Sequence, residues 1–178
     1  MATGEPMDTF TIAERIHGNE LAFDRDRAPA RPDELALTRC LLAAARTETI
    51  RLVASATAAE LDWDDPGRRL PAWAHWRTAR QLAWHVADVE SRYYLAALGV
   101  PPPPRADDLL AELRGSAANV QATLGELAPD RSGGPIRGEW TTVKALRRLA
   151  WHEPGELVVL RRLLARARCA LRGQGGER

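Results

Sequence analysis

Apolar residues recur at the spacing of an α-helix in four long segments of this chain, and stretches rich in proline or glycine separate these segments. We expect helices over residues 33 to about 60, 77 to 98, 106 to 127 and 141 to about 168. Four consecutive prolines, Pro101–Pro104, end the second segment, because proline lacks the backbone N–H that an α-helix needs. No stretch of any length alternates apolar and polar residues as a half-buried strand would. The sequence therefore predicts an all-α fold, a four-helix bundle.

The residues on either side of the predicted bundle have a different composition. Residues 1–32 predict an irregular N-terminal lead-in, because charged residues and prolines interrupt its second half. The bundle is expected over residues 33–172, followed by a frayed, glycine-rich tail over residues 173–178. A chain of 178 residues is long enough to bury a core as a single domain.

Composition and charge argue against several classes of partner. The formal net charge is +1, so nothing in the overall charge favours a nucleic acid or an anionic membrane surface. No apolar run approaches the ~20 residues that span a bilayer. Residues 1–10 lack the basic start and apolar run of a signal peptide, so we expect a cytoplasmic protein.

Two histidines and one carboxylate lie where a helical bundle could bring them together. His85 falls in the second predicted helix, and His152 and Glu156 fall in the fourth. Residues four apart share one face of a continuous helix, and metal sites in bundles are built from side chains that project inward from facing helices. Two imidazoles and one carboxylate suit zinc, nickel or ferrous iron, and three protein ligands leave positions for water or substrate. The pattern predicts a divalent-metal site.

A second interpretation of the same residues stays open. A single histidine on an apolar helix face is more often a hydrogen-bonded core residue than a ligand. Pro154 and Gly155 stand between His152 and Glu156, and a kink there would turn the Glu156 carboxylate either into the site or away from it. Glu153 is expected to be a bystander. Asp88, one turn after His85, is a candidate to orient the His85 ring as a second-shell partner.

Two motifs resemble those of a known family. The segment WRTARQLAWH over residues 76–85, followed by Glu90 and Tyr93, resembles the second-helix motif of the DinB superfamily. The segment WTTVKALRRLAWHE over residues 140–153 resembles the last-helix motif of the same family. The resemblance covers about residues 33 to 168, so it extends over the whole predicted bundle.

This resemblance implies a fold and a cofactor. DinB-like proteins are four-helix bundles that include metal-dependent enzymes and thiol-dependent S-transferases, and they are similar to the metal-binding domain of mycothiol-dependent maleylpyruvate isomerase. The family's first two metal ligands match His85 and His152. Its third ligand is normally a histidine four residues after the second, and this chain has Glu156 there. That difference fits a site of two histidines and a carboxylate, and it also fits a weakened or lost site.

Residues and resemblance together favour a divalent-metal-dependent transferase or hydrolase acting on a small molecule, with a low-molecular-weight thiol as one expected substrate. In this hypothesis Glu156 is the third ligand or a base beside bound water. The competing hypothesis is a non-catalytic bundle, used for binding or dimerisation, with a degenerate metal site. The sequence leaves the oligomeric state open, with a homodimer as one alternative.

Overall fold

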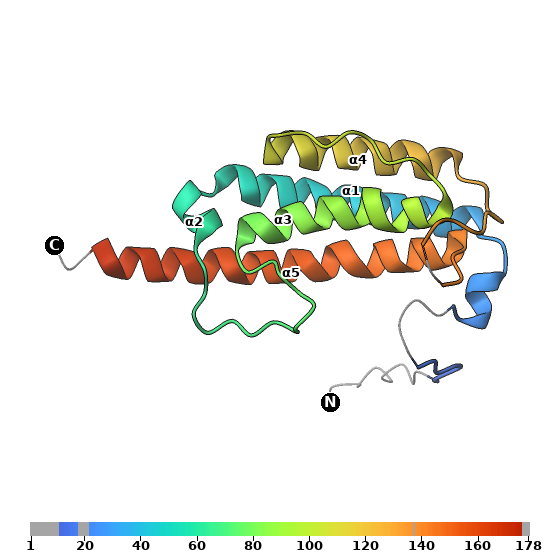
Figure 1. Cartoon of the computed structure of the whole chain (residues 1–178), viewed down its shortest axis with the longest axis horizontal. Coiled ribbons are helices and arrows are strands. Elements are labelled where there is room, and N and C mark those ends of the chain that lie inside the picture. Colours follow the sequence, from blue (N-terminus) through green and yellow to red (C-terminus); the bar gives the residue numbers. More distant parts are fainter. Residues whose placement is uncertain (1–10, 18–21, 137, 176–178) are drawn as a thin grey trace, which may run out of the picture.

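The computed structural model describes residues 11–17, 22–136 and 138–175, and within these residues the fold is all-α (Figure 1). A bundle of four long helical segments confirms the fold class that the sequence predicts. The helices are η1 (Asp24–Arg27), α1 (Pro32–Ser55), α2 (Ala58–Asp62), α3 (Ala79–Asp88) with its continuations η2 (Val89–Tyr94) and η3 (Ala96–Leu98), α4 (Leu109–Glu126) and α5 (Thr142–Gly175).

The four long segments lie side by side with an unusual order of directions. Figure 1 shows α1 and α5 running in one direction and α3 and α4 running in the other. The connection over residues 99–108 therefore returns along the length of the bundle before α4 begins. Helices α1 and α3 each pack against both α4 and α5, so that α1 and α3 occupy opposite corners of the bundle.

The second long segment changes its winding in the middle. It is α-helical up to Asp88, π-helical over Val89–Tyr94 and a 3₁₀ turn over Ala96–Leu98. Together these elements reach the predicted end at residue 98. A π-helical turn accommodates an extra residue and thereby shifts the faces that follow it, and such turns are frequent at functional sites.

Side-chain caps explain several helix boundaries. The Thr141 hydroxyl accepts a hydrogen bond from the Lys144 backbone N–H at 3.2 Å, as expected for the N-cap of α5. Thr57 and Glu60 cap a new helix, α2, so that α1 ends at Ser55 and not near residue 60. Helix α5 extends to Gly175, beyond the end expected near residue 168, and residues 176–178 lie outside the described residues.

Most of residues 1–32 either form irregular backbone or lie outside the described residues. Residues 11–17 have no regular structure, and η1 supplies a single 3₁₀ turn; residues 1–10 and 18–21 are not described. Asp26 of this turn is buried and binds Arg147 of α5 at 2.6 Å, which fastens the lead-in to the bundle. Every described helix is too short or too polar to cross a membrane.

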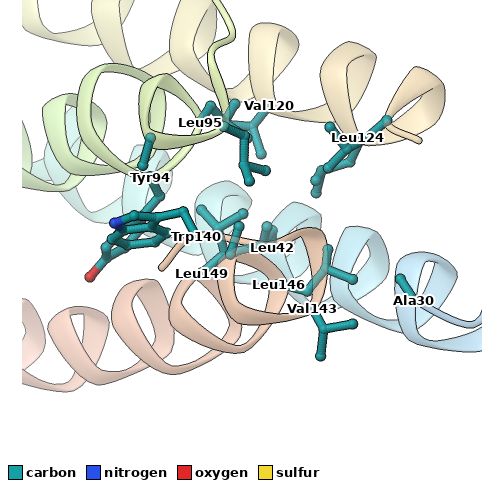
Figure 2. Close-up of a cluster of buried hydrophobic side chains, with 14 residues drawn as sticks. Ala30, Leu42, Tyr94, Leu95, Val120, Leu124, Trp140, Val143, Leu146 and Leu149 are labelled. Atoms are coloured by element: carbon teal, nitrogen blue, oxygen red, sulfur yellow. The ribbon is translucent and has the colours of Figure 1, made fainter. Parts of the chain in front are cut away.

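The apolar core is divided into two clusters. One gathers around Leu42, Trp140 and Leu149, whose side chains lie close together in Figure 2. The other gathers around Leu82 and Leu113. Each long segment also carries buried polar residues beside these clusters, namely Arg46 and Thr49 in α1, Glu90 and Ser91 in η2, Ser116 in α4, and His152 and Glu153 in α5.

Apolar spacing alone does not identify the buried face of α1. Leu37 and Leu41 fit an apolar stripe by spacing, yet their side chains are exposed, Leu37 by 70%. The buried face of α1 instead runs through Leu42, Ala45 and Thr49. Leu37 lines an open hollow with Phe23 of the lead-in and Val143 of α5, so its side chain stays largely in contact with solvent.

Leucine-to-alanine substitutions at two positions test which leucines belong to the core. Leu149→Ala removes a fully buried side chain and should lower the free energy of unfolding by about 2–5 kcal/mol, because a cavity replaces its contacts. Leu37→Ala should change it by no more than about 0.5 kcal/mol. Urea unfolding of both variants measures the difference, and equal losses would contradict the assignment.

Candidate metal centre

His85, His152 and Glu156 converge on one point between α3 and α5. Each side chain offers one ligand atom, and these three atoms lie within 4.8 Å of one another. Among the described residues, this is the one group of three or more histidine, cysteine, aspartate or glutamate side chains with such spacing. The structure therefore brings together the three residues that sequence reasoning selects as metal ligands.

The geometry of α5 explains why Glu156 lies beside His152. Successive residues of an α-helix are turned by about 100°, so residues four apart return to one face. Helix α5 remains helical through Pro154 and continues as one ribbon (Figure 1). Pro154 lacks a backbone N–H, but the residues on either side of it remain helical. The Glu156 carboxylate therefore lies beside the two imidazoles.

The separation of the two imidazoles fits a shared ion. The Nε2 atom of His85 lies 3.2 Å from the Nε2 atom of His152. Two nitrogens bound at ~2.05 Å to a tetrahedral ion lie about 3.3 Å apart. The same separation suits a hydrogen bond, in which one Nε2 carries a proton and the other does not. A shared ion instead requires both Nε2 atoms to be deprotonated.

Burial keeps both imidazoles neutral at physiological pH. Loss of solvent lowers the pKa of His85 from 6.5 to about 4. Burial, followed by electrostatic repulsion from His85, Arg148 and Arg46 when His152 is protonated, lowers the pKa of His152 to about 3. A neutral imidazole has a lone pair that can bind a metal ion.

The carboxylate of the group is also shielded from water. Burial raises the pKa of Glu156, and the positive charge of Arg68 opposes this effect. Arg68 belongs to the connection between α2 and α3, and its Nη1 donates to the backbone oxygen of Arg77 at 2.6 Å. Ionising a buried carboxylate without a partner is costly, so a cation between Glu156 and the imidazoles would stabilise the ionised form strongly.

A groove of about 420 Å³ opens on the solvent side of His85. The indole of Trp76 stacks on the His85 ring, with 3.5 Å between the ring centroids and 12° between the planes. This indole excludes water from one face of the imidazole. The groove, which we call the His85 groove, is lined by His75, Trp76, Gln81, Trp84, His85, Asp88 and Arg105.

Asp88 does not bind His85. Its carboxylate is in ion pairs with Arg92, at 3.2 Å, and with Arg105, and no hydrogen bond connects it to the His85 ring among the described residues. Two guanidinium groups compete better than a neutral imidazole for one carboxylate, because both partners are charged. The second-shell role that sequence reasoning gives to Asp88 is therefore not observed.

Sequence reasoning does not identify the buried ion cluster behind the histidines. The Arg46 guanidinium donates from Nε to Glu153 at 2.6 Å and from Nη2 to Glu90 at 2.6 Å. Its Nη1 donates to the backbone oxygen of Leu113 at 2.8 Å. The Arg46, Glu90 and Glu153 side chains are all at least 96% buried. Glu153, a predicted bystander, is thus one of the most constrained residues beside His152.

The charge balance of this cluster follows from its burial. Two carboxylates face one guanidinium, so one negative charge has no cation of its own. Burial, together with the adjacent Glu153 carboxylate, raises the pKa of Glu90 well above its usual range, against the effect of Arg46. The only sequence signal for the cluster is the position of Arg46, which lies on the same helix face as Leu42, Ala45 and Thr49.

The lowered histidine pKa values predict a pH dependence of the metal-free protein. The unfolded chain binds protons near pH 6.5, whereas the folded chain binds them only near pH 4 and 3. This contribution to stability is fully present above pH 6.5 and is lost as the pH falls through the folded values. With a chelator present, unfolding free energies from pH 7.5 to 3 should fall more steeply for the wild type than for His85→Gln/His152→Gln. Parallel curves would contradict the burial of neutral imidazoles.

Comparison with known proteins agrees with this architecture. The family model of the DinB superfamily matches residues 41–154. This range includes His85 and His152 and ends two residues before Glu156. No curated protein and no solved structure matches the chain. Because the matched range covers well over half of the sequence and contains both histidines of the candidate centre, the chain belongs to the DinB superfamily.

Proposed function

We propose that this protein is a divalent-metal-dependent enzyme of the DinB type, with His85, His152 and Glu156 as its metal ligands. The observation that carries the proposal is the meeting of three ligand atoms within 4.8 Å in a site that burial keeps free of protonated imidazole. Two nitrogens and one carboxylate oxygen suit zinc, nickel or ferrous iron. Three protein ligands leave room for water or substrate.

The proposed reaction is a transfer or hydrolysis on a small molecule. A bound ion supplies an acidified water or substrate thiol, or a polarised carbonyl. The His85 groove offers a surface beside the site on which a small organic substrate could lie against the indoles of Trp76 and Trp84. A low-molecular-weight thiol is the substrate that we propose first, because a thiolate is a strong ligand for the proposed ions. If Glu156 does not bind the ion, its place beside a bound water suits a general base.

The first test measures bound metal. Freshly purified wild type should carry close to one equivalent of zinc, nickel or iron by elemental analysis. His85→Ala, His152→Ala and Glu156→Gln should each lose most of it, because each removes one of three protein ligands. His75→Ala is the matched control, since His75 lines the same groove but does not belong to the ligand group. Unchanged metal content in the three ligand variants would contradict the proposed site.

The second test separates the enzyme from a non-catalytic bundle with a degenerate site. A metal present at 100 times its dissociation constant should stabilise the folded chain by ~2.7 kcal/mol. Thermal melts of chelator-treated protein with and without zinc, nickel or ferrous iron measure this effect. No rise in melting temperature with any of the three ions would favour a binding or dimerisation module.

A further inference from the structure

We infer that Arg46 is a positioning residue that sets the spacing of His85 and His152 through the two carboxylates beside them. The inference rests on the proposed function, because it concerns the site in which these histidines bind a metal. Arg46 itself touches neither imidazole in the described contacts. It acts through Glu153, which follows His152 directly in α5, and through Glu90, which lies in the π-helical continuation of the helix that carries His85.

The contacts of Arg46 show how one side chain can hold two helices. Nε and Nη2 each donate at 2.6 Å, one to the Glu153 carboxylate and the other to the Glu90 carboxylate. The guanidinium is planar, so the directions of these two donors are fixed relative to one another. The third contact, from Nη1 to the Leu113 backbone oxygen at 2.8 Å, fixes the guanidinium against α4. A rigid fork therefore links α5 and the α3–η2 segment at the level of the histidines.

Aromatic rings contact both ligand imidazoles, but the described contacts do not supply the hydrogen bonds that usually orient metal-binding histidines. Metal-binding histidines usually donate their second ring N–H to a carboxylate or carbonyl, which fixes the ring. The His152 Nδ1 atom is buried and has no hydrogen-bond partner among the described residues. Asp88, the candidate partner of His85 from the sequence, is in ion pairs with two arginines. Because the described residues give the two rings no hydrogen bond of this kind, their relative placement depends strongly on the placement of the helices that carry them.

Charge alone does not explain the arrangement. A buried carboxylate needs a compensating cation, and a lysine at position 46 would supply one. A lysine ammonium is a point charge on a flexible stem, however, and does not impose the geometry of a planar fork. We therefore expect Arg46→Lys to keep the positive charge beside Glu90 and Glu153 but to lose the spacing of His85 and His152.

The test measures metal affinity and coordination geometry together. Zinc affinity is measured by competition with a chromophoric chelator, and Co²⁺ is added separately so that its visible d–d absorption reports the coordination geometry. Arg46→Lys and Arg46→Met should bind zinc about 10- to 100-fold more weakly than the wild type, as losses of outer-shell partners do, and should show altered Co²⁺ spectra. Wild-type affinity together with a wild-type spectrum in Arg46→Lys would overturn the inference.

Arg147→Met is the matched control. Arg147 also lies in α5 and also binds a buried carboxylate, that of Asp26, at 2.6 Å. Its partner belongs to η1, away from the helix that carries His85. This variant should keep the zinc affinity and Co²⁺ spectrum of the wild type. An effect as large as that of Arg46→Lys would overturn the specific role of Arg46.

A triple variant covers the case in which Arg46→Met does not fold. Arg46→Met/Glu90→Met/Glu153→Met removes every charge of the cluster, and replacing a whole buried ion cluster with apolar residues is often tolerated. It should fold, as judged by circular dichroism, and still bind zinc about 10- to 100-fold more weakly. Wild-type zinc binding by the folded triple variant would overturn the inference. If the wild type itself binds neither zinc nor Co²⁺, the proposed function fails and this inference fails with it.

Discussion

The guanidinium of Arg46 binds groups from the other three long helical segments in the middle of the bundle. From α1 it reaches Glu90 after α3, Leu113 in α4 and Glu153 in α5. Moving three ionisable groups out of water is costly, and their mutual attraction offsets that cost only when the geometry is good. Leaving any one of them without its partners would therefore destabilise the bundle. This cluster requires the helices to meet in one relative placement, which an apolar layer alone would not specify.

The candidate metal centre lies next to this cluster and shares its helices. Glu153 and Glu90 face Arg46 in the middle of the bundle. His152 and His85 instead face one another, on the side of the connection between α2 and α3. On α5, the side chains of His152 and Glu153 point about 100° apart because they are successive helix residues. One helix therefore contributes a residue to the metal centre and another to the ion cluster. Trp76 stacks on His85 from the connection before α3 and covers one face of that imidazole. Burial then gives neutral imidazoles, which a divalent cation needs.

Helix positions and the two histidines could be predicted from the sequence because they depend on local patterns. Apolar spacing locates the four long segments, and Thr141 marks the start of α5. The direction of Glu156 could not be predicted, since it depends on whether α5 tolerates Pro154 without turning. The partners of Asp88 were also beyond sequence reasoning, because Arg105 approaches from a connection that only the fold places nearby. The ion pair of Arg46 and Glu153 could not be predicted either, because little in the local sequence distinguishes these residues from solvent-exposed helical ones.

The most direct test of this account is an anomalous difference map from crystals of the zinc-loaded protein, collected at the zinc edge. We predict one strong peak between the Nε2 atoms of His85 and His152 and the Glu156 carboxylate, with nitrogen and oxygen distances of about 2.0–2.2 Å. Arg46 should still bind Glu90 and Glu153 in the same crystal. A map with no peak there, with the two imidazoles joined by a direct hydrogen bond, would contradict the account.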